Sequence, residues 1–294
     1  MRLLVTGARG LLGAAIVREF GAAGWEVVPL HRDTLDVTDG GAVARQVAEA
    51  RPDLVVNCVA YNDVDGAEKE PVTALQVNAL AVRSLAAAAK GAGATLVHYG
   101  TDFVFDGEGD RPYVEEDRPN PRSAYGVSKL LGEWFALDHP RAYVLRVESL
   151  FGEPGPDGGR QGSLKGILVR LRAGEQLPVF VDRTVSPGYT TDIAAATRTL
   201  VEQGAPPGVY HCVNAGPTSW ADIAAEAARL LGVPIDMKPI TLESVALPAR
   251  RPKYSALSVA KLAAAGIAMP PWQDALARHL RGEGSRRSEV GGRR

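Results

Sequence analysis

Residues 2–13, RLLVTGARGLLG, join a short apolar run to three glycines, Gly7, Gly10 and Gly13. The apolar run has the composition of a β-strand, and Leu11 to Ala22 continues with a helical pattern. A glycine turn between a strand and a helix presents backbone N–H groups and the helix N-terminus to a pyrophosphate. Glycines also occur in ordinary turns, but this context at the start of the chain predicts a dinucleotide-binding site.

The alternation of short apolar runs and longer helical patterns continues to about residue 150. Besides residues 2–6, strands are expected at 26–30, 53–57, 94–100 and 142–147. Helices are expected at Leu11 to Ala22, Gly41 to Ala50, Val72 to Ala92 and Tyr125 to Leu137. Strand–helix–strand units of this kind predict an α/β fold, a doubly wound parallel sheet of the Rossmann type, with ligands at the carboxyl ends of the strands.

The pattern changes at a Gly/Pro-rich stretch, residues 152–162, which marks the start of a second lobe. We expect residues 1–150 to form the nucleotide-binding Rossmann domain, with about 183–215 returning to it. About 151–182 and 216–280 are then expected to form a smaller C-terminal lobe that binds substrate. Residues 282–294, GEGSRRSEVGGRR, are polar and lack an apolar period, which predicts a disordered tail.

Composition narrows the class of protein. The formal net charge of the 294 residues is -1, so there is no overall electrostatic reason to expect nucleic acid or an anionic membrane as partner. No stretch approaches about 18 apolar residues and no apolar leader opens the chain, so a cytoplasmic protein is expected. Cys58 and Cys212 lie in apolar runs, which predicts reduced, buried thiols.

The end of the second strand bears on the choice of cofactor. Sites that prefer NAD place an acidic residue there, whereas this sequence has His31 and Arg32. A guanidinium pairs with a 2'-phosphate, so Arg32 favours NADP(H). Asp33 keeps NAD(H) as the alternative, and a solvated surface role for Arg32 also remains open.

A tyrosine and a lysine four residues apart, Tyr125 and Lys129, lie on one face of the fourth expected helix. An ammonium beside a phenol favours the phenolate, so Lys129 is expected to lower the pKa of Tyr125 and to prepare it for proton transfer. The strand that ends in Tyr99 and Gly100 is followed by Thr101, whose hydroxyl can reach the same substrate oxygen. These residues predict a reductase-type catalytic site.

Several stretches together resemble the dTDP-4-dehydrorhamnose reductase family of the extended short-chain dehydrogenases. They extend from residue 3 to about 280: VTGARGLLG, LDVTD, RPDLVVN, YNDVDGAEKEP, HYGTDFVFDG, NPRSAYGVSKLLGE, VYHCVNAGPTSWADIA and RPKYSALS. The resemblance implies that hydride passes from NADPH to the 4-keto group of a nucleotide-activated 6-deoxyhexose. Tyr125 is then the proton donor, with Lys129 and Thr101 completing the catalytic set. It also implies a homodimer.

The resemblance further implies positions along the cofactor. Gly10, Leu11 and Leu12 are expected under the pyrophosphate, and Asp36 and Val37 beside the adenine. The nicotinamide side is expected to contain Ala60, Tyr61, Asn62 and Tyr99, while the substrate residues are Thr101, Asp102, Phe103 and Ser149. Arg251 is a further substrate candidate, since a guanidinium fits the oxygens of a diphosphate, and a surface ion pair is its alternative. Gly100 stands where the family usually has Ser, and Ser149 where it often has Trp, and both departures bear on the substrate. No metal is expected.

Other residues have simpler interpretations. His98 is expected to be a core histidine. Asn78 fits either a buried anchor of the sheet or the active-site network, and Trp220 fits packing better than stacking on a ligand. Among other functions, a dehydratase is disfavoured because Phe103, rather than a second acid, follows Asp102. The alternatives that remain are a sugar-nucleotide epimerase and a non-catalytic NADP-binding subunit resembling the regulatory subunit of methionine adenosyltransferase.

Overall fold

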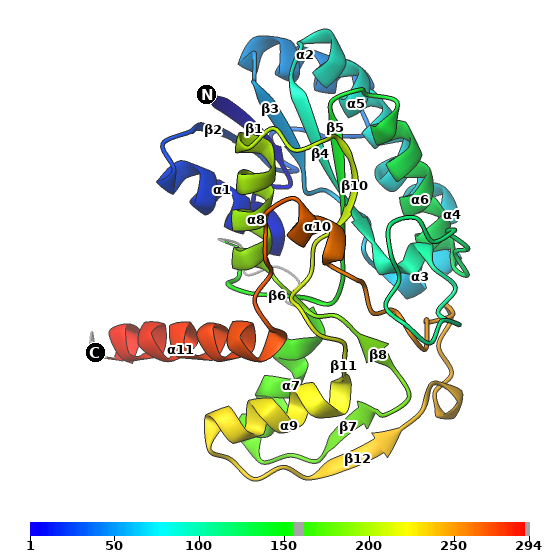
Figure 1. Ribbon diagram of the computed structural model, residues 1–294, viewed down its shortest axis with the longest axis vertical. Helices are drawn as coiled ribbons and strands as arrows, with labels where there is room; N and C mark the ends of the chain where they lie inside the picture. Colours follow the sequence, from blue (N-terminus) through cyan, green and yellow to red (C-terminus); the bar gives the residue numbers. More distant parts are fainter. Residues whose placement is uncertain (156–161, 292–294) are drawn as a thin grey trace.

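A parallel six-stranded sheet, in the order β10-β5-β4-β3-β1-β2, forms the centre of the molecule (Figure 1). The computed structural model describes residues 1–155 and 162–291, with side chains described as far as residue 283. The strands are β1 (Arg2–Thr6), β2 (Glu26–Leu30), β3 (Leu54–Asn57), β4 (Thr95–Thr101), β5 (Ala142–Val147) and β10 (Gly208–His211). Because all the neighbouring strands pair in parallel, the predicted doubly wound α/β fold is confirmed.

Helices cover both faces of this sheet. On one face lie α1 (Leu11–Ala22) and α8 (Thr190–Glu202), and on the other α2 (Gly40–Ala50), α5 (Ala81–Gly91) and α6 (Ala124–Leu137). Along β1, Leu3 and Val5 pack into the first layer and Leu4 into the second, as the period of two in a strand requires. Burial on both faces explains why these strands are continuously apolar.

The helix predicted for Val72 to Ala92 is not α-helical throughout. It consists of α4 (Pro71–Leu75), a π-helical turn (Gln76–Leu80) and α5. Among the described helices, Pro71–Gly91 has the length and the apolar composition that a membrane-spanning helix needs. It packs against α2 and α6, and α5 forms part of the cover of the sheet.

A second hydrophobic core lies beyond the carboxyl ends of the strands, in the lower part of Figure 1. It includes Leu168, Ala227 and Trp272. Small paired strands frame it: β6 (Leu150–Phe151) with β9 (Gly188–Tyr189), β7 (Leu177–Phe180) with β12 (Met237–Ile240), and β8 (Thr184–Val185) with β11 (Thr218–Ser219). Its helices are α7 (Gly162–Ala173), α9 (Trp220–Leu231) and the start of α11 (Trp272–Gly291), while α10 (Ala260–Ala264) lies against β10.

The structure differs from the expectation of a disordered tail at residues 282–294. Helix α11 continues to Gly291 and projects from the body of the molecule (Figure 1), whereas residues 292–294 lie outside the described residues. The first turns of α11 are anchored by the buried side chains of Trp272, Ala275 and Leu276. A helix nucleated by such packing gains one hydrogen bond for each further residue, so it extends into a segment with no apolar period.

Candidate active site

One cleft of about 1310 Å³ runs along the carboxyl ends of the sheet and borders the second core. It includes the gap between β1 and β3, where the strand order reverses and where such folds bind ligands. The predicted site residues line this one cleft, except Gly13: Gly7, Gly10, Leu11, Leu12, Arg32, Asp36, Val37, Ala60, Tyr61, Asn62, Tyr99, Thr101, Asp102, Phe103, Tyr125, Lys129, Ser149 and Arg251.

The glycines of the β1–α1 turn are required by close backbone contacts. Gly7 has a φ of 72°, and a Cβ atom there would lie 2.9 Å from the carbonyl carbon of Cys58. A Cβ on Gly13 would lie 2.1 Å from the carbonyl oxygen of Gly7, so Gly13 allows α1 to pack against the turn instead of lining the cleft. The turn can therefore hold a pyrophosphate against the N-terminus of α1.

Basic residues gather where a ribose 2'-substituent would lie. Arg32 is exposed, and Asp33 accepts a hydrogen bond from Arg9 at 3.2 Å and lies 3.3 Å from the His31 ring. Asp36 accepts hydrogen bonds from both the backbone and the side chain of Thr38, and these lower its pKa. Arg9 was missed in the sequence, although it stands inside the glycine motif that was recognised.

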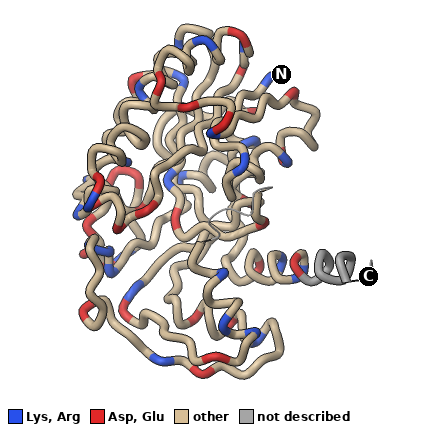
Figure 2. The backbone as a smooth tube through the Cα atoms, turned by 180° about the vertical axis from the view of Figure 1, so that it is seen from behind, with Lys and Arg blue, Asp and Glu red and all other residues tan. Residues whose placement is uncertain are grey.

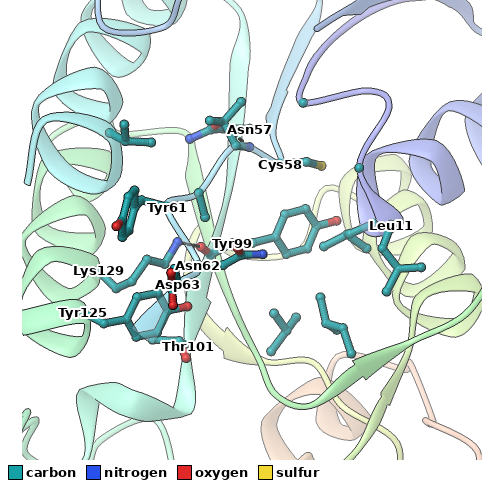
Figure 3. A pocket seen from close by; sticks show the side chains of 18 of the residues that line it. Leu11, Asn57, Cys58, Tyr61, Asn62, Asp63, Tyr99, Thr101, Tyr125 and Lys129 are labelled. Carbon is teal, nitrogen blue, oxygen red and sulfur yellow. Dashed lines mark hydrogen bonds between the residues drawn. The ribbon is translucent and has the colours of Figure 1, made fainter. Parts of the chain in front are cut away.

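The predicted catalytic side chains come from β4 and the first turns of α6. Figure 3 shows Thr101, Tyr125 and Lys129 together on one side of the pocket, with Leu11 on the other. Ser123 caps α6 by accepting a hydrogen bond from the backbone N–H of Gly126 at 3.1 Å, which fixes the start of the helix. The Nζ of Lys129 donates to the carbonyl oxygen of Tyr99 at 2.5 Å, so α6 is tied to β4.

The expected lowering of the Tyr125 pKa is wrong for the protein alone. Burial raises the pKa of Tyr125, and the nearby Asp102 raises it further, although a hydrogen bond with Thr101 opposes this. The Lys129 ammonium donates to Tyr99 and not to the phenol. Tyr125 is therefore fully protonated at neutral pH, the form that a proton donor needs.

Burial lowers the pKa of Lys129 to about 8, against the opposing effect of Glu133 and Cys58. Lys129 is 3% exposed, and the loss of hydration disfavours its charged form. An ammonium with a pKa this close to neutrality changes charge within the ordinary working range of pH.

Asn78 anchors the loop after β3 to α6. Its Oδ1 accepts from the backbone N–H of Tyr61 at 2.8 Å, and its Nδ2 donates to the Tyr61 carbonyl oxygen at 3.0 Å and to Ser128 Oγ at 2.9 Å. Asn78 lies in the π-helical turn, a feature that is often found at functional sites. Of its two interpretations, the structure supports an anchor that also positions residues of the site.

Two acids and one arginine form a buried group of which only Asp102 was predicted from the sequence, while Glu148 and Arg183 were missed. Asp102 is 3% exposed, its Oδ1 accepts from Thr101 at 2.9 Å, and its Oδ2 is buried without a hydrogen-bond partner among the described residues. Glu148 accepts from the Ser186 backbone at 2.6 Å and from Ser255 Oγ at 2.5 Å. Arg183 lines the same part of the cleft, and its charge acts on both carboxylates.

These acids hold their protons more tightly than exposed ones. Burial raises the pKa of Asp102 to about 6, and burial together with Asp102 raises that of Glu148 well above its ordinary value. The three residues lie on separate segments, after β4, after β5 and after β7. No motif spacing could have shown that they meet, because the second lobe brings Arg183 to the sheet.

Gly100, where the family usually has Ser, is explained by a neighbour. A Cβ atom at this position would lie 2.2 Å from Oε1 of Glu133. Glu133 is buried and forms an ion pair with Arg146 at 2.9 Å, with further hydrogen bonds to the same guanidinium. The glycine therefore makes room for a buried ion pair beneath the catalytic residues.

The other proposed substrate residues have different surroundings. Phe103 contacts the Tyr125 ring edge-on, with the ring centres 5.4 Å apart. Ser149 has a φ of 45°, unusual for a residue other than glycine, and lines the cleft. Arg251 is paired with Asp65 at 2.8 Å, so its guanidinium is already engaged in the protein alone.

Residues given simpler interpretations behave accordingly. His98 is fully buried, its Nδ1 lies 3.1 Å from Asn57 Nδ2, and burial holds its pKa well below the usual value, as expected of a core histidine. Trp220 is packed in the second core, although it also touches the cleft. Both cysteines are free thiols; Cys212 is buried and Cys58 only partly so.

Among the described residues, no group of three or more His, Cys, Asp or Glu side chains could hold a metal ion.

Comparison with known proteins places this geometry in a family. The protein-family model described as "RmlD substrate binding domain" matches residues 1–283 of this chain. The chain belongs to the RmlD, or dTDP-4-dehydrorhamnose reductase, family. It is 40% identical to the dTDP-4-dehydrorhamnose reductase of Streptomyces griseus over 284 residues, 94% of this chain and 91% of that protein.

Two further members illustrate the family. A probable dTDP-4,6-dihydroxy-2-methyloxan-3-one 4-ketoreductase of Streptomyces antibioticus is 38% identical, over 94% of this chain and 93% of that protein. A solved structure of the Bacillus anthracis dTDP-4-dehydrorhamnose reductase in complex with NADP is similar with a TM-score of 0.90. It is 31% identical and covers 96% of this chain and 99% of that one. Membership of the RmlD family therefore extends to fold and sequence over nearly the whole chain.

Proposed function

We propose that this protein reduces the 4-keto group of a nucleotide-activated 6-deoxyhexose with NADPH. The observation that carries the proposal is the single cleft in which the glycine turn and the set Thr101, Tyr125 and Lys129 lie together. The named relatives, dTDP-4-dehydrorhamnose reductases and a 4-ketoreductase, support the same reaction. Because these relatives are named as reductases and the predicted catalytic set is complete, the non-catalytic and epimerase alternatives are not favoured.

The residues present fit NADP(H). The tight turn of Gly7, Gly10 and Gly13 leaves the space that a pyrophosphate needs, and Arg32 and Arg9 offer cations to a 2'-phosphate. The reductase of Bacillus anthracis with NADP bound supports the same choice. When bound, the cofactor supplies the hydride.

Arg32→Ala is expected to raise the KM for NADPH about tenfold while leaving the KM for NADH within twofold, since one charge-assisted contact is worth about 1.5 kcal/mol.

The catalytic residues act on the carbonyl oxygen. In this proposal Tyr125 donates a hydrogen bond to this oxygen, and Thr101 joins it by turning its hydroxyl away from Asp102, to which it donates in the protein alone. The protonated phenol of Tyr125 then gives its proton to the alkoxide that forms as hydride adds. Lys129 supplies a positive charge that favours the resulting phenolate. Its bond to Tyr99 holds that charge at the end of β4, beside the expected nicotinamide position.

The direct test is NADPH oxidation followed at 340 nm with enzymatically generated dTDP-4-keto-6-deoxyhexose. Wild-type protein is expected to turn over, and Tyr125→Phe to lose about a hundredfold or more, as removal of a general acid predicts. Tyr254→Phe is a matched control, since Tyr254 lies outside the cleft, and should keep its activity. Tight NADPH binding without any turnover by the wild type would overturn the proposal.

The division into domains remains part of the proposal. We infer that residues 1–150 with about 183–215 bind the cofactor, and that about 151–182 and 216–280 bind the sugar nucleotide. The strand β10 in the main sheet and the separate second core support this division.

We also propose a cytoplasmic homodimer without nucleic-acid or membrane partners. Basic and acidic residues are interspersed along the chain in Figure 2, which gives no reason to expect a polyanion as partner.

Large apolar side chains are exposed on α6 and on the neighbouring Pro71–Gly91 stretch: Val72, Leu80, Val127, Trp134 and Leu137. Trp134→Glu is expected to convert a dimer into a monomer in light scattering. A monomeric wild type would contradict the proposed dimer.

A further inference from the structure

Arg183 is a cation of the cleft whose hydrogen-bonding capacity is only partly used. It follows β7, lines the cleft, and donates from Nε to the Pro252 carbonyl oxygen at 3.2 Å. No other nitrogen of its guanidinium donates to an acceptor within residues 1–155 or 162–283. An arginine carries five N–H donors, so most donors of this cleft-lining residue have no partner among the described side chains and backbone.

Two acids keep this guanidinium in place without occupying its donors. Asp102 and Glu148 both attract it electrostatically, yet neither forms a direct ion pair with it among the described side chains. Glu148 is already engaged by Ser186 and Ser255, and Asp102 by Thr101. Asp102 therefore balances the charge of Arg183 while the donors of the guanidinium stay available to a ligand.

The surrounding charges favour a neutral oxygen over an anion. A phosphate beside Arg183 would lie near the carboxylate of Asp102, and like charges in a poorly hydrated site repel strongly. Arg251, the other cation that acts on Arg183, is already paired with Asp65. A sugar hydroxyl adds no charge and accepts a hydrogen bond from a guanidinium. Ser149, which follows Glu148 in the cleft, leaves the space of a larger side chain for such a group.

The position of Arg183 indicates which hydroxyl this is. Asp102, which attracts Arg183, directly follows Thr101 and is hydrogen-bonded to it. In the proposed function Thr101 contacts the carbonyl oxygen that is reduced. The hydroxyl group of the sugar that lies nearest to this oxygen is the one on the carbon adjacent to the carbonyl.

We propose that Arg183 binds the hydroxyl group next to the reacting carbonyl and thereby sets the specificity for the sugar. Asp102 acts as its counter-charge, and Asp102 and Glu148 act as positioning residues. This inference rests on the proposed reductase function, and it assigns to Arg183 a role in substrate choice.

The test crosses a change in the protein with a change in the substrate. Wild type, Arg183→Met and Arg183→Lys are assayed by NADPH oxidation with dTDP-4-keto-6-deoxyhexose and with its analogue that has hydrogen in place of the adjacent hydroxyl. Arg183→Met is expected to lose about 10- to 100-fold in kcat/KM on the hydroxylated substrate, the effect of a hydrogen bond from a charged donor. On the deoxy analogue the loss should be less than about threefold. Arg183→Lys keeps the charge without the guanidinium fork and should fall between.

The outcomes separate the two proposals. An equal loss on both substrates, or no loss on either, would overturn the role of Arg183 while leaving the reductase function intact. A wild type that reduces neither substrate would overturn the reductase function and this inference with it. NADPH affinity, measured by fluorescence, should be the same in all three proteins, and an Arg183→Lys variant without discrimination between substrates would contradict the inference even if Arg183→Met did not fold.

Discussion

Lys129 and Tyr125 show that the pKa values of two side chains do not follow from their residue types and spacing alone. Their spacing was sufficient to identify the pair, and the expected effect of the lysine on the tyrosine was nevertheless wrong. The direction of a pKa shift depends on burial and on the atom to which the ammonium donates. In this protein that atom is the Tyr99 carbonyl oxygen, which only the fold brings to Lys129.

A pH profile follows from the pKa of Lys129, which is about 8. Lys129 carries its positive charge below pH 8 and loses it as the pH rises through that value. Since the charge favours the phenolate that forms when Tyr125 gives up its proton, kcat/KM should fall above pH 8, approaching about tenfold per unit. Rates measured from pH 6 to 9.5 check this, and Lys129→Met should abolish the decline. A wild-type profile that is flat to pH 9.5 would refute this role of the charge.

Glu148 should make stability depend on pH. Burial and Asp102 raise its pKa in the folded state, so the folded protein binds the proton more tightly than the unfolded chain. Its contribution to stability is therefore present below the unfolded pKa and decreases as the pH rises above about 4.3, the ordinary value for glutamate. Glu148→Gln removes this term and can keep the bonds to Ser186 and Ser255.

The Tm of wild type and Glu148→Gln should be compared at pH 5 and pH 8. Relative to wild type, the variant is expected to gain stability on going from pH 5 to pH 8. Asp102, whose pKa is about 6, remains in both proteins, but the variant also loses the repulsion between Asp102 and Glu148, which changes stability in the same direction. Parallel changes in Tm for the two proteins would show that Glu148 is ionised without cost.

At the scale of elements, the sequence predicted the main sheet closely because its signals are local. The strands 2–6, 26–30 and 142–147 have the predicted bounds, since apolar runs between glycine or polar breaks define them. The π-helical turn was not predicted, because it depends on a tertiary contact. Asn78 meets Tyr61 and Ser128 there, and no helical period contains that information.

The packing of α6 on this turn gives a test of the element. A Cβ at Gly132 would lie 2.0 Å from the carbonyl oxygen of Asn78, so α6 could not keep its position in Gly132→Ala. We expect a loss of about 1–3 kcal/mol in the free energy of unfolding, as for other overpacked sites, and a lower kcat because Lys129 and Tyr125 move with the helix.

Gly166→Ala in α7 is the matched control. Apart from its chain neighbours and the backbone of its own helix, no described atom lies within 4 Å of the position of its Cβ. Alanine should therefore stabilise the protein by about 0.5–1 kcal/mol through its higher helix propensity. Both variants are measured by urea unfolding and by turnover. Equal stability of Gly132→Ala and wild type would show that α6 and the π-helical turn are not tightly coupled.

For the whole molecule, the half of the site that belongs to the sheet was predictable and the half that crosses to the second lobe was not. Glycine spacing and the Tyr–Lys pair have local patterns that a sequence can reveal. Arg183 and Glu148 belong to segments with no such pattern, and they come together only through the packing of the second core. Arg251 was recognised, but its partner Asp65, far away in the sequence, was not.

The contact between Arg251 and Asp65 joins the segment after β12 to α3 (Val64–Lys69) across the cleft. Asp65 also accepts a hydrogen bond from the Ala249 backbone at 3.1 Å, and although burial raises its pKa, these bonds lower it overall. Since both residues line the cleft, the pair sets how closely the two sides approach each other. Its loss should weaken the binding of a ligand that touches both sides more than that of one held by the glycine turn.

Asp65→Asn is therefore expected to raise the KM for the nucleotide sugar about tenfold, the effect of losing one charge-assisted hydrogen bond, and to leave the Kd for NADPH within about twofold. Glu226→Gln, which removes the exposed ion pair with Arg229 on α9, should change neither constant, because exposed pairs contribute about 0–1 kcal/mol. The constants are obtained from steady-state kinetics and fluorescence titration. If Asp65→Asn weakened the binding of NADPH as much as the binding of the sugar nucleotide, the pair of Asp65 and Arg251 would act on the fold of the cofactor site. The two sides of the cleft would then have to be held together by the packing of their cores.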